Sequence, residues 1–242
     1  MLILINGLTL IHVLAGFACL GLGLAAMLAR PKGAERHRRP GRRFMASILI
    51  VAVTALILLT FRWNPFFFAL SVFSFYLAFS GWRVLRRKRP DLHADQRARP
   101  VDWLAATASL ATGIAAVFIY FAGGFGHQSD QAAVVLGTLA FAALAAVYDL
   151  WRFAFPLVLP RLAPRVIRGV WLLEHQTKLS GAFIALACAF SGTVARDIPP
   201  ALAQTIPAMV GTPLLLFFAW QQWRRLRRTT SPATTSSTEQ VN

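Results

Sequence analysis

Acidic residues are scarce in this sequence: nine Asp and Glu stand against 25 Lys and Arg, and charged residues make up only 14% of 242. Soluble domains carry roughly 25% charged residues, so a hydrophobic share of 57% indicates that water is not the main solvent. A net charge of +16 can mark a nucleic-acid partner, but these cations form short clusters between long apolar runs. We therefore expect no nucleic acid and predict the lipid bilayer as the partner.

Cysteine and the common metal motifs are also rare or missing. Cys19 and Cys188 both lie within apolar segments, where a thiol behaves as a small hydrophobe, and two such residues define no disulfide framework. The sequence contains no H-E-x-x-H, no C-x-x-C and no pair of histidines four residues apart on one predicted helix. It therefore specifies no cofactor, and any metal or haem remains unknown.

The N-terminal apolar stretch has no charge before Arg30 and seven cations from there to Arg43. A signal peptide needs its positive charge before the apolar stretch, with a small-residue cleavage site after it. We therefore expect this stretch to be a retained first membrane span.

Seven apolar stretches are long enough, or nearly so, to cross about 30 Å of hydrocarbon as helices. The sequence therefore predicts an all-α integral membrane bundle of about seven spans, forming one transmembrane domain over residues 1–228. The spans are expected near 3–29, 44–61, 65–82, 102–123, 132–153, 173–195 and 201–223.

Positive charge alternates between the connections. Residues 30–43 and 83–99 hold seven Lys and Arg each, and 152–168 and 224–228 hold four each, whereas the other three connections hold at most one. Short Lys/Arg-rich loops stay in the cytoplasm, which predicts an outside N-terminus, a cytoplasmic C-terminus and a bacterial inner-membrane location. Six of the seven tryptophans fall at predicted cytoplasmic ends, as in an interfacial aromatic belt, and the basic loops are expected to meet anionic lipids.

Two segments fall outside the spans. Residues 154–172 are broken by three prolines and then carry arginines at helical spacing, which predicts a helix lying in the cytoplasmic interface before span six begins. Residues 229–242 are polar and rich in Ser and Thr, which predicts a disordered cytoplasmic tail.

Ionisable residues within or beside spans are costly and are functional candidates for that reason. His93 and His127 are expected on the surface. The candidates at the spans or in the basic loops are His12, His37, Asp102, Asp149, Glu174 and His175.

Each candidate also has a structural interpretation. Asp102 follows Pro100 and suits the first turn of a helix, while Glu174 and Lys178 suit an i, i+4 ion pair. His12 is expected to bond a neighbouring backbone carbonyl. The alternative is that the five cytoplasmic candidates converge on a metal or proton-transfer site, with His37 and His175 as the metal candidates.

The landmarks resemble a widespread bacterial family of polytopic membrane proteins of unknown function. His12 is followed by Lys32-Gly33, His37-Arg38 and Gly41-Arg42, which is similar to that family's His…KGxxxHRxxGR signature. At span six, similar sequences show His-Met-Gly-Arg-Met where this chain has His175-Gln-Thr-Lys-Leu. The resemblance implies an integral inner-membrane protein, brings no activity, and raises the weight of His12, His37 and His175.

Three classes of function remain open. A small-molecule or ion transporter needs a polar cavity within the membrane. A membrane-embedded metal or haem redox protein needs a bound group at His37 or His175. A structural or regulatory membrane subunit needs only packing faces and basic loops.

Overall fold

The computed structural model describes residues 2–122, 129–156, 164–195 and 197–228, and within them it contains helices and no strands. The predicted tail 229–242, His127 and residues 157–163 of the predicted interfacial segment lie outside the described residues. Seven long helices and two short 3-10 turns follow one another along the chain. They are α1 (Leu2–Leu28), α2 (Glu35–Phe61), α3 (Pro65–Arg83), η1 (Val84–Arg86), η2 (Ala94–Gln96), α4 (Pro100–Phe121), α5 (Ser129–Ala154), α6 (Pro164–Val194) and α7 (Pro200–Arg228).

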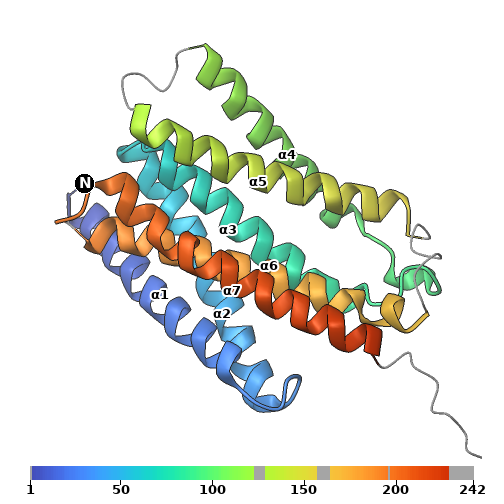
Figure 1. The fold of residues 1–242 in the computed structure, drawn as a ribbon. Coiled ribbons are helices and arrows are strands. Elements are labelled where there is room, and N and C mark those ends of the chain that lie inside the picture. Colours follow the sequence, from blue (N-terminus) through green and yellow to red (C-terminus); the bar gives the residue numbers. More distant parts are fainter. Residues whose placement is uncertain (1, 123–128, 157–163, 196, 229–242) are drawn as a thin grey trace, which may run out of the picture.

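All seven long helices are long and apolar enough to cross a membrane, which confirms the all-α, seven-span prediction. Each contains a continuous apolar stretch, and in hydrocarbon a helix satisfies its backbone groups within its own segment. The N-terminus lies at one end of the bundle and the end of α7 at the other, as an odd number of spans requires (Figure 1).

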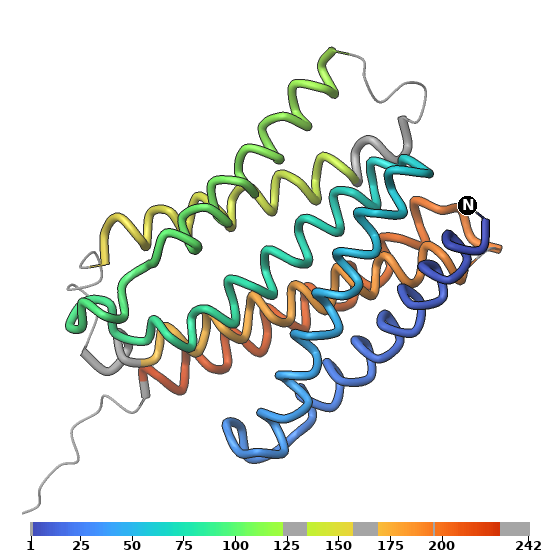
Figure 2. Tube along the Cα trace, turned by 180° about the vertical axis from the view of Figure 1, so that it is seen from behind, coloured from blue at the N-terminus to red at the C-terminus, as the bar shows by residue number. Residues whose placement is uncertain are grey.

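Helix α3 forms the centre of the bundle. It packs against α2, α4, α5 and α6, and it is the most buried of the seven spans. Helices α1 and α2 pair along one edge, and α4 and α5 pair along the opposite edge (Figure 2). Helix α7 lies along α6. Polar side chains on α3 therefore face protein rather than lipid.

The start of α3 shows how local sequence sets a helix boundary. The Asn64 side chain accepts a hydrogen bond from the Phe67 backbone N–H at 3.1 Å, and Pro65 occupies the first helical position. Asparagine caps the free N–H groups of the first turn, and proline at this position loses no helical hydrogen bond.

Two predicted boundaries are wrong. Residues 35–43 were expected in a loop but form the first turns of α2, with Pro40 inside the helix. The interfacial helix expected to end before span six is instead continuous with it, because α6 runs from Pro164 to Val194. Charged residues at a helix end reach water without ending the helix, so hydropathy underestimates the length of both helices.

Candidate functional site

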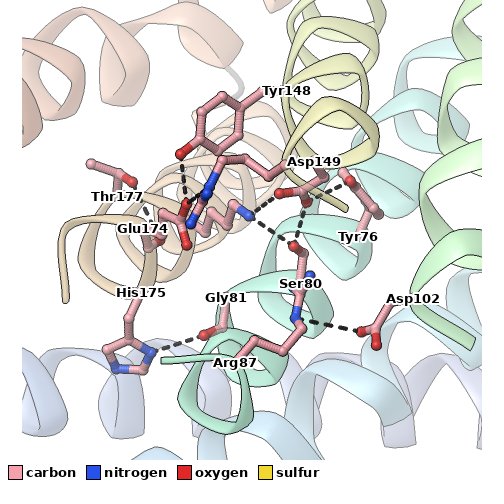
Figure 3. A network of polar contacts seen from close by, with 12 residues as sticks. Tyr76, Ser80, Gly81, Arg87, Asp102, Tyr148, Asp149, Glu174, His175 and Thr177 are labelled. Carbon is pink, nitrogen blue, oxygen red and sulfur yellow. Dashed lines mark hydrogen bonds and ion pairs between the residues drawn. The ribbon is translucent and has the colours of Figure 1, made fainter. Parts of the chain in front are cut away.

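Buried charges gather on α3, α4, α5 and α6 and on the residue that follows η1 (Figure 3). Buried ionisable side chains are rare within membrane spans, because an unpaired charge in hydrocarbon costs several kcal/mol. The buried charged residues of the described chain are Arg83, Arg87, Asp102, Asp149 and Lys178.

Asp149 is the centre of the first group. Its carboxylate accepts hydrogen bonds from the Tyr76 hydroxyl at 2.7 Å, from the Ser80 hydroxyl at 2.5 Å and from the Lys178 ammonium. Ser80 also accepts a hydrogen bond from Lys178 at 2.9 Å. Residues from α3, α5 and α6 thus satisfy one another around an ion pair whose side chains are 2% and 7% exposed.

The close approach of α3 and α6 at Gly81 makes this arrangement possible. A Cβ atom built on Gly81 would lie 2.1 Å from Leu179 Cδ2 and 2.9 Å from Lys178 Cβ, so a larger residue would push the helices apart. Small residues commonly permit such contacts between membrane helices.

Glu174 forms a second group beside the first. It accepts hydrogen bonds from the Tyr148 hydroxyl at 2.6 Å and from Arg152 Nε at 3.1 Å. The expected i, i+4 pair between Glu174 and Lys178 is wrong: no ion pair joins them in the described residues, and Lys178 turns to Asp149 instead. Burial explains the difference, because partners on α5 lie within the bundle.

Asp102 forms a third group in the first turn of α4, where its position predicts an acidic residue. Arg83 donates two hydrogen bonds to it, at 2.8 and 2.7 Å, and the Arg99 backbone N–H donates a third at 2.9 Å. Arg87 Nε lies 3.9 Å from the same carboxylate. Asp102 therefore caps its helix and also neutralises a buried guanidinium.

A small cavity of about 20 Å³ separates these groups and is lined by Arg87, Asp149, Arg152 and Glu174, among others. Within the described chain, Arg87 Nε and Arg152 Nη1 are buried without a hydrogen-bond partner. A volume of this size holds about one water molecule, and a polar lining favours its binding.

A second, larger cleft of about 430 Å³ has Lys178 in its wall. Helix α5 forms one wall and α7 the other, with α6 and Leu77 of α3 at its base. Most of the lining is apolar, but Tyr148, Arg152, Glu174 and Lys178 gather at one part of it. Lys178 thus belongs both to the buried ion pair and to the wall of the cleft.

The Lys32-Gly33 motif and His37 cap the end of α1. Lys32 Nζ donates to the Ala26 carbonyl at 3.1 Å and to that of Met27, and His37 Nδ1 donates to the Ala26 carbonyl at 2.9 Å. Gly33 has a φ of +82°, which glycine adopts without strain. Burial, followed by repulsion from Arg30, lowers the pKa of Lys32.

The remaining histidines differ in their contacts. His12 Nδ1 lies 2.8 Å from Thr54 Oγ1 on α2, and the ring also bonds the Val51 backbone, which agrees with the expected carbonyl partner. His175 Nδ1 donates to the Gly81 carbonyl at 2.9 Å, and its ring centroid lies 6.5 Å from that of His37.

The five candidates expected at the cytoplasmic end do not converge on one point. Among the described residues no three His, Cys, Asp or Glu side chains are grouped as a metal would require. Asp149 and Glu174 line the same small cavity, Asp102 belongs to the arginine group, and His37 and His175 form a pair of their own. Sequence reasoning missed Arg83 of α3 and Arg87, which follows η1, because it assigned both to a basic loop.

This architecture, seven apolar helices around buried ion pairs, defines a multi-pass helical membrane protein. The chain belongs to the family described as "Predicted membrane protein (DUF2306)", whose model matches residues 9–152. No curated protein and no solved structure matches the chain. The matched range ends at Arg152 and so includes Asp149 but not Lys178.

Proposed function

We propose that this protein is a small-molecule transporter that takes an anionic amphiphile from the bilayer into the cleft between α5 and α7. The observation that carries the proposal is the cleft itself, whose wall is mostly apolar and also includes Arg152, Glu174 and Lys178. Its volume of about 430 Å³ lies within the range of small-molecule sites, roughly 300–1,000 Å³.

The walls of the cleft favour entry from the lipid. Phe141 and Trp151 line it and are themselves 57% and 39% exposed on α5, a surface that contacts hydrocarbon in a bilayer. An acyl or alkyl chain can therefore pass from lipid to cleft without crossing water, which keeps the cost of transfer low.

The charged part of the cleft favours an anionic head group. Arg152 and Lys178 both line it, and the Lys178 ammonium lies 5.7 Å from the centre of the Tyr148 ring in the same wall. An anion bound there would compete with Asp149 for Lys178.

The substitution Ala145→Trp is expected to abolish binding, because Ala145 lines the cleft and an indole would fill it. Native mass spectrometry of detergent-purified protein measures binding of dodecyl sulfonate, with dodecyltrimethylammonium as the cationic comparison. Wild type is expected to bind one sulfonate per chain. Ala140→Trp is the matched control, since Ala140 is exposed on the same helix and does not line the cleft.

Equal sulfonate binding by both tryptophan variants, or a preference for the cationic probe, would contradict the site. Transport itself is measured as exchange of a fluorescent, single-chain anionic lipid between leaflets of proteoliposomes. Wild type is expected to accelerate this exchange over protein-free vesicles, and Ala145→Trp is not. A protein that binds the sulfonate but leaves the exchange unchanged would be a receptor rather than a transporter.

The clustered cations support an orientation with the N-terminus outside and the C-terminus in the cytoplasm of a bacterial cell, in its inner membrane. The basic segment before and within α2, the α3–α4 connection and the end of α7 lie at the same end of the bundle (Figure 1). Anionic lipid head groups on the cytoplasmic face would attract them, at about 1 kcal/mol per cation near the surface.

Reporter fusions test this orientation. A phosphatase, active only outside the cytoplasm, is expected to be active when fused after Gly126 and inactive after Asp91. A fluorescent protein that folds only in the cytoplasm is expected to show the reverse. The same localisation for both positions would overturn the arrangement.

A further inference from the structure

We infer that His37 and His175 form a two-histidine site for a monovalent copper ion, separate from the cleft. The two residues come from α2 and α6, and their hydrogen bonds to Ala26 and Gly81 involve α1 and α3 as well. Four helices therefore position the two imidazole rings.

The hydrogen bonds define the state of each ring. Nδ1 of His37 and Nδ1 of His175 both face a backbone carbonyl, which only accepts hydrogen bonds, so each Nδ1 carries the proton. In a neutral imidazole Nε2 then carries the free lone pair. Metal-binding histidines commonly show this pattern, with the other ring nitrogen donating to a carbonyl or carboxylate.

Neither Nε2 atom has a hydrogen-bond partner among the described residues. On His175 this nitrogen lies on the side of the ring turned away from the Gly81 carbonyl (Figure 3). Both residues are half-buried, and each Nε2 keeps a lone pair that a cation can accept. A bound cation would satisfy both.

The separation of the rings suits one ion between them. Their centroids are 6.5 Å apart with an interplanar angle of 81°. Two metal–nitrogen bonds of about 2.1 Å, together with the two ring radii, place the centroids of opposed imidazoles roughly 6.4 Å apart. Crossed ring planes are compatible with coordination from opposite sides.

The surrounding charge selects a monovalent ion. No third His, Cys, Asp or Glu joins this pair in the described part of the chain, so no carboxylate or thiolate offsets a second positive charge. Lys32 Nζ shares the Ala26 carbonyl with His37 and adds a cation nearby. Imidazole suits copper, and monovalent copper is stable with two opposed nitrogen ligands, whereas zinc prefers four ligands.

The first test titrates purified wild-type protein with monovalent copper under a reducing, oxygen-free atmosphere, against a chromogenic copper chelator. One copper per chain is expected, with X-ray absorption showing two nitrogen neighbours. His37→Ala and His175→Ala are each expected to lose about tenfold or more in affinity, while the surface control His93→Ala retains it. Unchanged affinity in both variants would overturn the site.

A second test avoids variants that fold poorly. Diethyl pyrocarbonate modifies imidazole nitrogens that carry a free lone pair, and mass spectrometry locates the modified residues on wild-type protein. Copper is expected to protect His37 and His175 but not His93, and magnesium is expected to protect none of them. Unprotected His37 and His175 in the presence of copper would refute the proposal, and so would a haem absorption band that disappears with either histidine.

These outcomes are independent of the proposed transport function. His175 follows the cleft residue Glu174 on α6, but neither His175 nor His37 lines the cleft. If the protein binds copper but not sulfonate, the copper site is supported and the proposed transport function is contradicted. If it binds sulfonate but not copper, the transport site is supported and the copper site is contradicted.

Discussion

Replacing Lys178 with methionine is expected to lower the free energy of unfolding by about 3–5 kcal/mol, because Asp149 would remain buried without its cation. The side chain of Asp149 is 2% exposed, so water cannot compensate for the loss. The measurement is SDS-induced unfolding of the purified protein in mixed micelles, followed by tryptophan fluorescence.

The double variant Asp149→Asn with Lys178→Met is expected to recover much of this loss. An asparagine oxygen still accepts hydrogen bonds from Tyr76 and Ser80, and no unpaired charge remains. If the double variant is no more stable than Lys178→Met, packing of the lysine stem rather than its charge explains the effect.

Arg42→Met provides the matched control for an exposed pair. Arg42 and Glu35 are 2.8 Å apart, but their side chains are 69% and 59% exposed. Surface ion pairs contribute little, so this substitution should leave the unfolding curve nearly unchanged. A loss equal to that of Lys178→Met would mean that the assay does not distinguish buried from exposed charge.

The sequence predicted the fold well, because the signal for a membrane helix is local. A run of about 20 apolar residues must form a helix in hydrocarbon whatever its neighbours are. The helix ends were predicted less well, as at Glu35, because arginines and a proline near a helix end resemble a loop in hydropathy alone.

The polar partners could not be predicted in the same way. Asp149 was a candidate from its position within a span, but its partners are 69, 73 and 29 residues away along the chain. Such contacts depend on how each helix is rotated, which composition does not determine. One signal was available: Tyr148, Asp149 and Arg152 stand close together at the end of an apolar stretch, where charged and aromatic side chains commonly meet other helices.

Asp102→Ala is expected to destabilise the protein by about 3–5 kcal/mol, because the change leaves the Arg83 guanidinium buried and unpaired. The Arg83 and Asp102 side chains are 6% and 1% exposed, and two parallel hydrogen bonds join them. The same substitution removes the acceptor for the Arg99 N–H at the start of α4, a cap worth about 1 kcal/mol.

Two further variants separate the charge from the cap. Asp102→Asn keeps an oxygen for the Arg99 N–H but loses the carboxylate. It should therefore retain the helix cap and still show most of the destabilisation expected for Asp102→Ala. Asp91→Ala is the control in the same basic connection. Hydrogen bonding from Arg89 lowers the pKa of Asp91, but the pair is 24% and 18% exposed, so its loss should cost much less.

The order of the three SDS unfolding midpoints therefore distinguishes the ion pair from the helix cap. The expected order of stability is Asp91→Ala above Asp102→Asn, with Asp102→Ala lowest. If Asp102→Asn matches wild type, Asp102 acts mainly as a helix cap and Arg83 finds water at the membrane surface. If it falls close to Asp102→Ala, the buried Arg83 depends on the carboxylate, and the connection between α3 and α4 is held in place by an ion pair inside the bundle.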